Sequence, residues 1–222
     1  MSEEPANRTV DVQAVRLQAG DEVVAEYERT LAPDERQRAA RFAFPDLRRS
    51  FVLARGALRF LLGRYLDTAP EAVRFVYGAK GKPALAAQGR MRFNVSHSGG
   101  LAVFAFTADC EVGVDVEEIR PLPDLADVAA RFFCAEETAE LMSLPADQRA
   151  AAFFRCWTRK EAYVKAIGDG LSAPLERPIP AGAWTLHDLE LAAGYEAALA
   201  YKDAERPVRV PPSVDAAQLL ER

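Results

Sequence analysis

Apolar and polar residues alternate along residues 9–17, and this period of two is the pattern of a half-buried β-strand. Further runs that are rich in β-branched and aromatic residues also have the length and composition of strands. These runs cover residues 73–77, 91–95, 101–107, 112–116, 184–191 and 195–201. Strands are therefore predicted in both halves of the chain.

Helical periodicity occupies the segments between the strands. The clearest helix is predicted over residues 46–66, where apolar residues recur every three or four positions with arginines among them. Residues 21–43 are also predicted to be helical, with a break and a new helix start at Pro33. In the second half, helices are predicted over residues 124–133, 136–144 and 147–167.

Glycine and proline limit these elements. Gly168 is expected to cap the last helix, and three prolines between residues 174 and 180 exclude a regular helix there. The tail from Pro207 is predicted to be irregular or extended. The predicted fold class is α+β, built as one domain or as two intimate halves, residues 1–111 and 112–222.

The composition excludes several classes of protein. Of 222 residues, 50% are apolar and 27% are charged, as in ordinary globular proteins. No apolar stretch is long enough to span a bilayer, and the acidic first ten residues lack the apolar core of a secretory signal. Three widely spaced cysteines form neither a disulfide framework nor a zinc signature. We therefore expect a cytoplasmic protein without a membrane partner.

The net charge of −5 is unevenly divided along the chain. Residues 1–111 carry 16 basic and 14 acidic side chains, whereas residues 112–222 carry 12 and 19. Residues 29–64 alone hold nine arginines against three acidic residues. These arginines form either a solvated helical face or a site for a polyanionic ligand such as a phosphate-rich cofactor. A nucleic acid is not the expected ligand, because the whole chain is acidic and no aromatic stacking pattern accompanies the arginines.

Two acidic residues share one face of the strand that opens the second half. In Val112-Gly-Val-Asp-Val-Glu-Glu, the side chains of Asp115 and Glu117 point to the same side as Gly113, and the valines point to the other. Neighbouring carboxylates repel each other unless a cation lies between them, so the pair suits a hard metal ion. An exposed acidic strand edge is the alternative interpretation.

A third carboxylate lies in the last predicted helix. Phe153, Trp157 and Val164 form an apolar stripe, and Glu161 falls in line with it. A buried carboxylate is costly without a compensating cation. One interpretation is a helical ion pair with Lys165, worth about 0.3–0.5 kcal/mol. The other is that Glu161 joins the two strand acids around Mg²⁺ and leaves coordination positions open for phosphate oxygens.

Two polar segments suit a phosphate or a nucleotide. In Phe93-Asn-Val-Ser-His-Ser-Gly-Gly, a strand is expected to break into a polar loop, where Ser96, His97 and Ser98 lie beside the free amides of two glycines. Gly81-Lys82-Pro83 is predicted to be a turn between strands and is by itself a weak signal.

Taken together, these segments resemble the 4′-phosphopantetheinyl transferases of the Sfp type. The resemblance includes Arg131-Phe-Phe-Cys-Ala-Glu-Glu and Trp157-Thr-Arg-Lys-Glu-Ala-Tyr-Val-Lys, and it covers about residues 30–175 in the family's order and spacing. The Asp-x-Glu strand combined with the Trp-x-x-Lys-Glu-x-x-x-Lys helix is its most specific part. The family implies two similar α+β halves related by a pseudo-two-fold axis, with coenzyme A in the cleft between them.

The resemblance also implies a reaction. Such enzymes move the 4′-phosphopantetheine arm of coenzyme A to a serine of an acyl or peptidyl carrier protein and release 3′,5′-ADP. Asp115, Glu117 and Glu161 would hold Mg²⁺ against the pyrophosphate, and Lys165 would contact the phosphate being transferred. Residues 112–222 would therefore supply the metal-binding and catalytic motifs, and residues 1–111 the nucleotide contacts.

Further roles follow from the same resemblance. Glu137, rather than Glu136, matches the family's proposed general base, and a water molecule on the metal is the alternative base. The family's basic pair in the front helical segment has three candidates, Arg36, Arg38 and Arg41. The residues implied to contact coenzyme A are Arg55, Lys82, Pro83, Ser96, His97, Lys160 and Lys165.

Two other functions remain open on the sequence alone. One is a metal-dependent phosphohydrolase that uses the same acids, and the other is a non-catalytic homologue that only binds coenzyme A or carrier proteins. The sequence does not distinguish a carrier of fatty-acid synthesis from one of polyketide or nonribosomal-peptide synthesis. A monomer is expected if the two halves complete the site.

Overall fold

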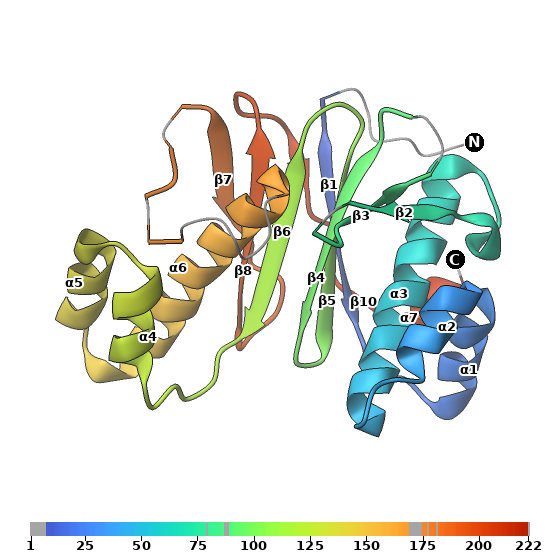
Figure 1. Ribbon diagram of the computed structural model, residues 1–222, viewed down its shortest axis with the longest axis horizontal. Helices are drawn as coiled ribbons and strands as arrows, with labels where there is room; N and C mark the ends of the chain where they lie inside the picture. Colours follow the sequence, from blue (N-terminus) through green and yellow to red (C-terminus); the bar gives the residue numbers. More distant parts are fainter. Residues whose placement is uncertain are drawn as a thin grey trace.

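The two halves of the chain lie side by side, and each builds a sheet with one long helix against it (Figure 1). The computed structural model describes residues 8–78, 80–86, 89–168, 175–176, 178–180 and 182–221. The α+β class predicted from the sequence is confirmed.

In the first half, the strand β5 pairs antiparallel with both β1 and β4, and the strands β2 and β3 form a separate hairpin. Proline opens two of the helices, at positions where a helix needs no backbone N–H. The elements are β1 (Val10–Arg16), α1 (Asp21–Thr30), α2 (Pro33–Ala39), α3 (Pro45–Leu66), a 3-10 turn (Pro70–Ala72), β2 (Phe75–Tyr77), β3 (Pro83–Leu85), β4 (Arg92–Ser98) and β5 (Leu101–Thr107).

In the second half, the strand β8 pairs antiparallel with β6 and with β7. The elements are β6 (Val112–Glu118), α4 (Leu125–Phe132), α5 (Ala135–Ser143), α6 (Ala146–Ile167), β7 (Trp184–Asp188) and β8 (Tyr195–Lys202). The helix α6 ends at Gly168, whose φ of 82° lies in the left-handed region, and the predicted glycine cap is thereby confirmed.

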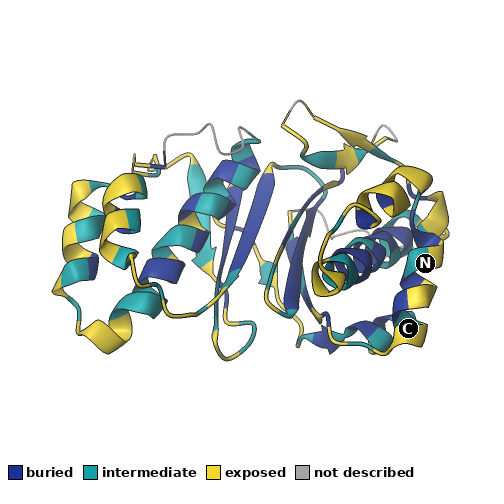
Figure 2. Cartoon of the chain, turned by 60° about the horizontal axis from the view of Figure 1, so that its bottom comes forward, coloured by how far each residue is buried: buried dark blue, intermediate teal, exposed yellow. Residues whose placement is uncertain are grey.

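The two sheets pack face to face, and the long helices cover their outer faces (Figure 2). Every residue of β5 is buried because both of its faces are covered. Leu101 and Val103 pack against the second sheet, whereas Phe104 and Phe106 pack against α3. On the far side of the second sheet, alanines of β8 pack against alanines of α6. The layers therefore run from α3 through the two sheets to α6.

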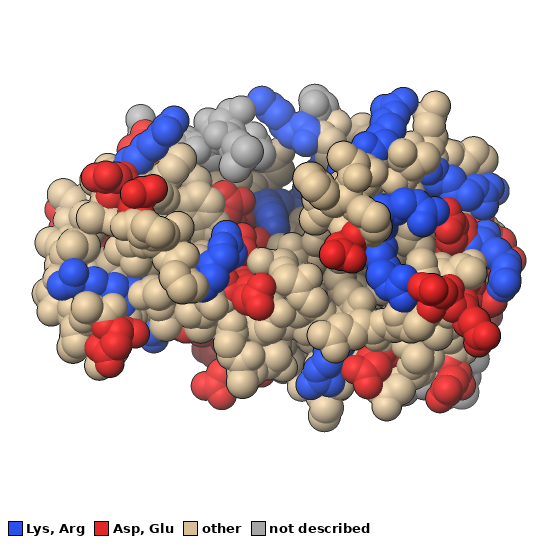
Figure 3. Space-filling model, turned by 90° about the horizontal axis from the view of Figure 1, so that it is seen from below, with Lys and Arg blue, Asp and Glu red and all other residues tan. Residues whose placement is uncertain are grey.

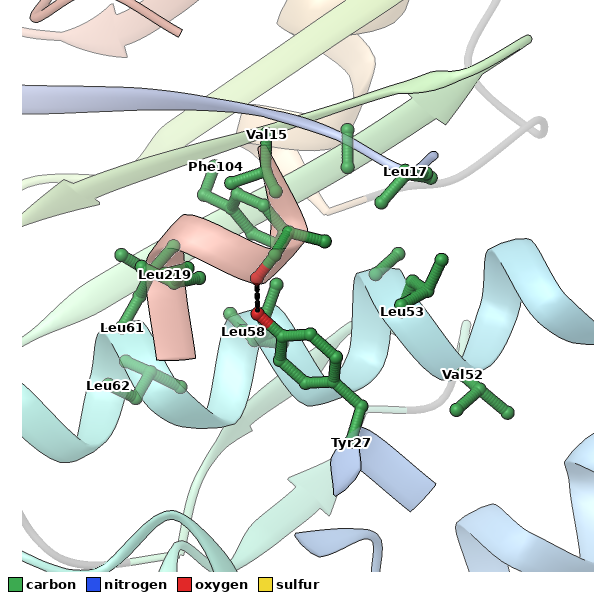
Figure 4. Packing of buried hydrophobic residues seen from close by; sticks show 14 of the residues in the cluster. Val15, Leu17, Tyr27, Val52, Leu53, Leu58, Leu61, Leu62, Phe104 and Leu219 are labelled. Carbon is green, nitrogen blue, oxygen red and sulfur yellow. Dashed lines mark hydrogen bonds between the residues drawn. The ribbon is translucent and has the colours of Figure 1, made fainter. Parts of the chain in front are cut away.

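The C-terminal tail folds back onto the first half. The tail was predicted to be irregular or extended, which holds through its two short strands, whereas the helix at its end was not predicted. Two strands and a helix pack there, and both strands pair in parallel with β1. The Tyr27 hydroxyl of α1 donates a hydrogen bond of 2.7 Å to the Ala216 carbonyl, and Leu219 packs among leucines of α3 (Figure 4). The elements are β9 (Val208–Arg209), β10 (Val214–Asp215) and α7 (Ala216–Leu220). Strands this short show no local pattern, because they form only against β1.

Smaller differences concern the polar segments. The predicted turn at Gly81-Lys82-Pro83 leads into β3, which the sequence pattern did not reveal. The predicted polar loop after Val95 is instead the continuation of β4 through Ser98. Pro178 and Pro180 lie outside any helix, as predicted, and Pro174 lies outside the described residues. Across the described part of the chain, no helix is long and apolar enough to cross a membrane.

Candidate active site at the junction of the two halves

Polar side chains, and not a backbone ladder, join β4 to β6 where the two halves meet. Each strand is the edge of its own sheet. Asn94, Ser96 and Ser98 occupy alternate positions of β4 and therefore point the same way. Asn94 Oδ1 accepts a hydrogen bond of 2.9 Å from the Val114 N–H, and Ser98 Oγ accepts one of 3.2 Å from the Glu118 N–H. These side chains thereby cover the open edge of β6.

The two acids of β6 receive hydrogen bonds from the same serines. Ser96 Oγ donates to Asp115 Oδ1 at 2.7 Å, and Ser98 Oγ donates to Glu117 Oε2 at 2.7 Å. The predicted alternation of β6 is confirmed, because its valines lie in the core between the sheets. Asp115 is only 3% exposed, so the interpretation as an exposed acidic edge is wrong for this residue.

Gly113 sets the distance between β6 and α6. A Cβ atom at this position would lie 2.1 Å from the Ala162 carbonyl oxygen and 2.4 Å from the Ala166 nitrogen. Only glycine therefore lets the helix lie directly on this face of the strand. The close approach brings Glu161 and Lys165, which neighbour the two alanines in sequence, to the acidic face of β6.

Lys165 links the two halves at the centre of the site. Its Nζ lies 2.6 Å from Asp115 Oδ1 and 2.8 Å from Ser96 Oγ. The ion-pair partner of Lys165 is therefore Asp115, and the interpretation of Glu161 and Lys165 as a helical surface pair is wrong.

Among the residues that the structure describes, two carboxylate oxygens at this site have no hydrogen-bond partner although they are buried, Asp115 Oδ2 and Glu161 Oε1. Burial raises the pKa of Asp115, against the opposing effect of Lys165. Burial also raises the pKa of Glu161, and the negative charges of Asp115 and Glu117 raise it further. Three carboxylates thus act on one another, and one ammonium group does not neutralise them.

A divalent cation would satisfy this set of oxygens. Two unpaired carboxylate oxygens beside a third carboxylate are the donors that Mg²⁺ prefers, so the residues fit the ion chemically. Within the described ranges, no three His, Cys, Asp or Glu side chains already converge on one metal position. Asp115 Oδ1 is engaged by Lys165 instead. Seen from below, the surface is hollowed between the halves, with acidic and basic side chains around the hollow (Figure 3).

The first half contributes a buried arginine, Arg55 of α3. Its Nε lies 3.6 Å from Glu35 Oε1, and its Nη1 is buried without a hydrogen-bond partner. Its guanidinium carbon lies 5.3 Å from the centre of the Phe75 ring. Glu35 is held in turn by Arg59 Nε at 2.7 Å. Burial lowers the pKa of Arg55. One glutamate thus serves two arginines, which leaves an excess positive charge.

His97 lies beside this positive charge. Desolvation lowers the pKa of its imidazole below the usual value, and the charges of Lys165, Arg38 and Arg55 lower it further. Because three cationic side chains act on one imidazole, this part of the junction is electropositive and suits a phosphate group. The alternation of β4 sends Ser96 towards the acids and His97 the other way, although both were predicted to contact the nucleotide.

Lys82 contacts the end of α6. Its Nζ donates to the carbonyl oxygens of Lys165 at 2.5 Å, Ala166 at 3.2 Å and Val112 at 3.4 Å. Burial lowers the pKa of Lys82. Lys82 and Pro83 also line a cavity of about 300 Å³ between the halves, closed on the other side by Val112 and Ile167.

Glu137 and Lys160 form a separate pair. Glu137 Oε2 accepts hydrogen bonds from the Cys134 N–H at 2.8 Å, at the start of α5, and lies 2.8 Å from Lys160 Nζ. Lys160 is buried and also donates to the Leu175 carbonyl at 2.8 Å. The contacts of Glu137 in the described residues therefore lie with α5 and α6, and none of them joins it to Asp115 or Glu161.

Sequence reasoning missed three residues around the site, Asn94, Glu35 and Arg59, and it assigned Ser98 to a phosphate rather than to Glu117. A signal was present for Asn94 and Ser98, because polar residues at positions 94, 96 and 98 keep the period of a strand. No sequence signal distinguishes the buried Glu35 and Arg59 from the many exposed charges nearby, because their pairing depends on how α2 packs on α3.

Two family models match the chain in succession. A model described as the N-terminal part of 4′-phosphopantetheinyl transferase matches residues 20–109, and one described as the 4′-phosphopantetheinyl transferase superfamily matches residues 111–204. The chain belongs to the 4′-phosphopantetheinyl transferase superfamily. The recognition from the motif segments is thereby confirmed, and the two matches adjoin at the connection between β5 and β6.

Several 4′-phosphopantetheinyl transferases are similar to the chain. HetI of Nostoc sp. strain PCC 7120 is 47% identical over 146 residues, which are 64% of this chain and 62% of HetI. Sfp of Bacillus subtilis strain 168 is 29% identical over 146 residues, 66% of this chain and 64% of Sfp. AcpT of Salmonella typhimurium is 44% identical over 110 residues, 50% of this chain and 56% of AcpT. Each match spans less than two thirds of the relative's own length.

Proposed function

We propose that this protein transfers the 4′-phosphopantetheine arm of coenzyme A to a serine hydroxyl of an apo carrier protein and releases 3′,5′-ADP. The observation that carries the proposal is the cluster of Asp115, Glu117 and Glu161 beside Lys165, at the junction of two halves that match the two family models. The serine oxygen would form a bond to the phosphorus that bears pantetheine, and the bond from that phosphorus to the 3′,5′-ADP oxygen would break.

Asp115, Glu117 and Glu161 would hold Mg²⁺ through their carboxylate oxygens. The bound ion would neutralise the charge of the pyrophosphate and of the leaving 3′,5′-ADP. The raised pKa values of Asp115 and Glu161 support this assignment, because burial and mutual repulsion disfavour three free carboxylates at one place.

Lys165 would stabilise the phosphate that is transferred. Its ammonium group is within 2.6 Å of Asp115 and 29% exposed, so it lies beside the acids and remains accessible. A compact ammonium group with three donors suits a phosphate whose charge grows as the bond to 3′,5′-ADP breaks.

The nucleotide end of coenzyme A would lie on the first half. Arg55 and His97 would face a phosphate there, with Arg38 adding positive charge. Arg55 Nη1 has no hydrogen-bond partner among the described residues, and the charges of Arg38 and Arg55 both act on the His97 imidazole. Lys82 and Pro83 would line the adjoining cavity. Ser96 would act at the other end of the site, through its hydrogen bond to Asp115.

Glu137 is our proposed general base, with a water molecule as the alternative. Its carboxylate is 28% exposed and holds Lys160, which was expected to contact coenzyme A. To accept the serine proton, the carboxylate would have to leave Lys160 and the Cys134 N–H when the carrier protein binds.

The partners follow from this reaction. They are coenzyme A and an acyl or peptidyl carrier protein, with no role for nucleic acid or a membrane. We propose that the protein acts as a monomer in the cytoplasm, because the two halves of one chain meet at the site and the three cysteines are free thiols.

Mass spectrometry tests the proposed reaction. An apo carrier protein incubated with coenzyme A, Mg²⁺ and the protein should gain the mass of one phosphopantetheine arm, and 3′,5′-ADP should appear in equal amount. Release of inorganic phosphate without an adduct would instead identify a phosphohydrolase. Binding of coenzyme A or the carrier without either product would identify a non-catalytic homologue. A panel of apo carriers from fatty-acid, polyketide and nonribosomal-peptide synthesis would identify the pathway.

A further inference from the structure

Ser98 is the last residue of β4, and it bonds to the end of β6 in two ways. Its hydroxyl donates to Glu117 Oε2 at 2.7 Å and accepts from the Glu118 N–H at 3.2 Å. A serine hydroxyl has one proton to donate, so the direction of these two bonds is determined. The same atom thus holds a carboxylate of β6 and the backbone that carries it.

Glu117 depends on its contact with Ser98 more than Asp115 depends on any one contact. Asp115 is only 3% exposed and is held by both Ser96 and Lys165. The Glu117 side chain is 25% exposed, and its other polar contact is Arg120 Nη1 at 3.5 Å from the same oxygen. Without Ser98, this half-exposed arginine would be the remaining polar contact of the carboxylate among the described residues.

Arg120 would compete with a bound cation for the Glu117 carboxylate. An arginine on Glu117 Oε2 competes with any cation for that oxygen, whereas a neutral hydroxyl orients the carboxylate and leaves its charge available. The Arg120 side chain is 54% exposed, so solvent screens its charge and weakens its pair with Glu117.

We propose that Ser98 is a positioning residue that orients Glu117 and thereby sets the affinity of the site for a divalent cation. The inference rests on the proposed function, which assigns Glu117 to the metal. Groups that orient metal ligands typically contribute about 10- to 100-fold in metal affinity. Removing the hydroxyl should therefore weaken cation binding by about that factor.

The test measures Mn²⁺ binding to the full chain without coenzyme A, from the paramagnetic resonance signal of free Mn²⁺. Ser98→Ala should weaken Mn²⁺ binding by about 10-fold or more, and Ser98→Thr, which keeps the hydroxyl, should restore most of it. Ser143→Ala is the matched control, because that hydroxyl donates to the Glu140 carbonyl at the end of α5. Glu117→Gln tests the ligand assignment itself.

The outcomes separate the inference from the function on which it rests. If Glu117→Gln weakens binding and Ser98→Ala does not, the positioning role is wrong and the ligand assignment stands. If Glu117→Gln binds Mn²⁺ as the unaltered protein does, the ligand assignment is wrong and the inference fails with it. Should Ser98→Ala not fold, Ser98→Cys keeps a side chain of similar size with a much weaker donor, and unchanged affinity of that variant would overturn the inference.

Discussion

The two long helices, α3 and α6, have the same architecture, but the buried group that each contributes differs in the sign of its charge: Arg55 in α3 and Glu161 in α6. Each has 22 residues, covers the outer face of its own sheet and ends at a residue with positive φ, Asp67 in α3 and Gly168 in α6. The helix α3 brings Arg55 close enough to His97 of β4 for its charge to act on the imidazole, whereas α6 brings Glu161 beside the acids of β6. A similar scaffold thus contributes buried groups of opposite charge.

The charges that remain uncompensated beside each helix indicate which kind of ligand would bind there. On α3, two arginines share Glu35, which leaves a positive excess. Beside α6, Asp115 pairs with Lys165 and Glu117 pairs with the exposed Arg120. The buried Glu161 Oε1 has no hydrogen-bond partner among the described residues, which leaves a negative excess in the buried part of the site. An anion suits the first group and a cation suits the second, so one ligand made of phosphates and a bound cation would satisfy both.

Removing the Glu161 carboxylate of α6 should have the largest effect on activity. Glu161→Ala should reduce phosphopantetheine transfer by about 100-fold or more, because a charge that acts on the transition state is lost, while the protein stays folded. The transfer rate and circular dichroism measure the two parts of this prediction. Glu140→Ala, an exposed acid of α5, is the control. Transfer at the unaltered rate in Glu161→Ala would contradict the assignment of Glu161 as a metal ligand.

The corresponding change beside α3 should act on stability. Glu35→Ala leaves Arg59, which is 1% exposed, without its carboxylate, and the free energy of unfolding should fall by about 3–5 kcal/mol. Glu28→Ala is the matched control, because its pair with Arg48 is partly exposed and should contribute at most about 1 kcal/mol. Urea titration measures both. Equal losses in the two variants would show that burial of the Glu35 pair has no special role.

A smaller effect is expected on the cofactor. Arg55→Met should raise the KM for coenzyme A by about tenfold, because a hydrogen bond to a charged group contributes about 1.5–3 kcal/mol. The KM for dephospho-coenzyme A, which lacks the 3′-phosphate, should change little, and kcat should be retained. Arg16→Met, an exposed arginine of β1, serves as the control. An equal rise in KM for both cofactors would place Arg55 away from the 3′-phosphate.

The smallest effect is a shift in one titration. His97 should titrate below its usual pKa, because desolvation and nearby positive charges favour the neutral ring. The unfolded chain then binds the proton more strongly than the folded one. The stability contributed by neutral His97 is therefore present above about pH 6.5 and is lost as the pH falls through the lower pKa of the folded state. Coenzyme A should raise this pKa, because its phosphate supplies negative charge.

Proton NMR can follow this titration cleanly, because the chain has only two histidines and a His97→Gln variant assigns the signal. A pKa of His97 at or above 6.5 in the free protein would contradict the electropositive environment at α3.

The sequence predicted α6 better than the junction as a whole. Periodicity predicted the helix that carries Glu161, and alternation predicted the strand face that carries Asp115, because both patterns are local. That the two carboxylates meet at one site was one of two interpretations of the residues, and the family resemblance implied it. The contact of β4 with β6 was not predictable, since it joins edges of two different sheets through side chains. Two of the three carbonyl oxygens that Lys82 contacts, those of Lys165 and Ala166, lie more than 80 residues away along the chain. Such contacts depend on how distant segments pack together, so a short stretch of sequence does not predict them.

The return of residues 208–220 to β1 also determines when the first half is complete during synthesis. β1 leaves the ribosome long before the strands β9 and β10 that cover its outer edge. At about 5–20 residues per second, that edge stays open for roughly 10 to 40 seconds in each round of translation. An open strand edge invites pairing with other chains. The newly made first half is therefore open to such pairing until residues 208–215 have been made.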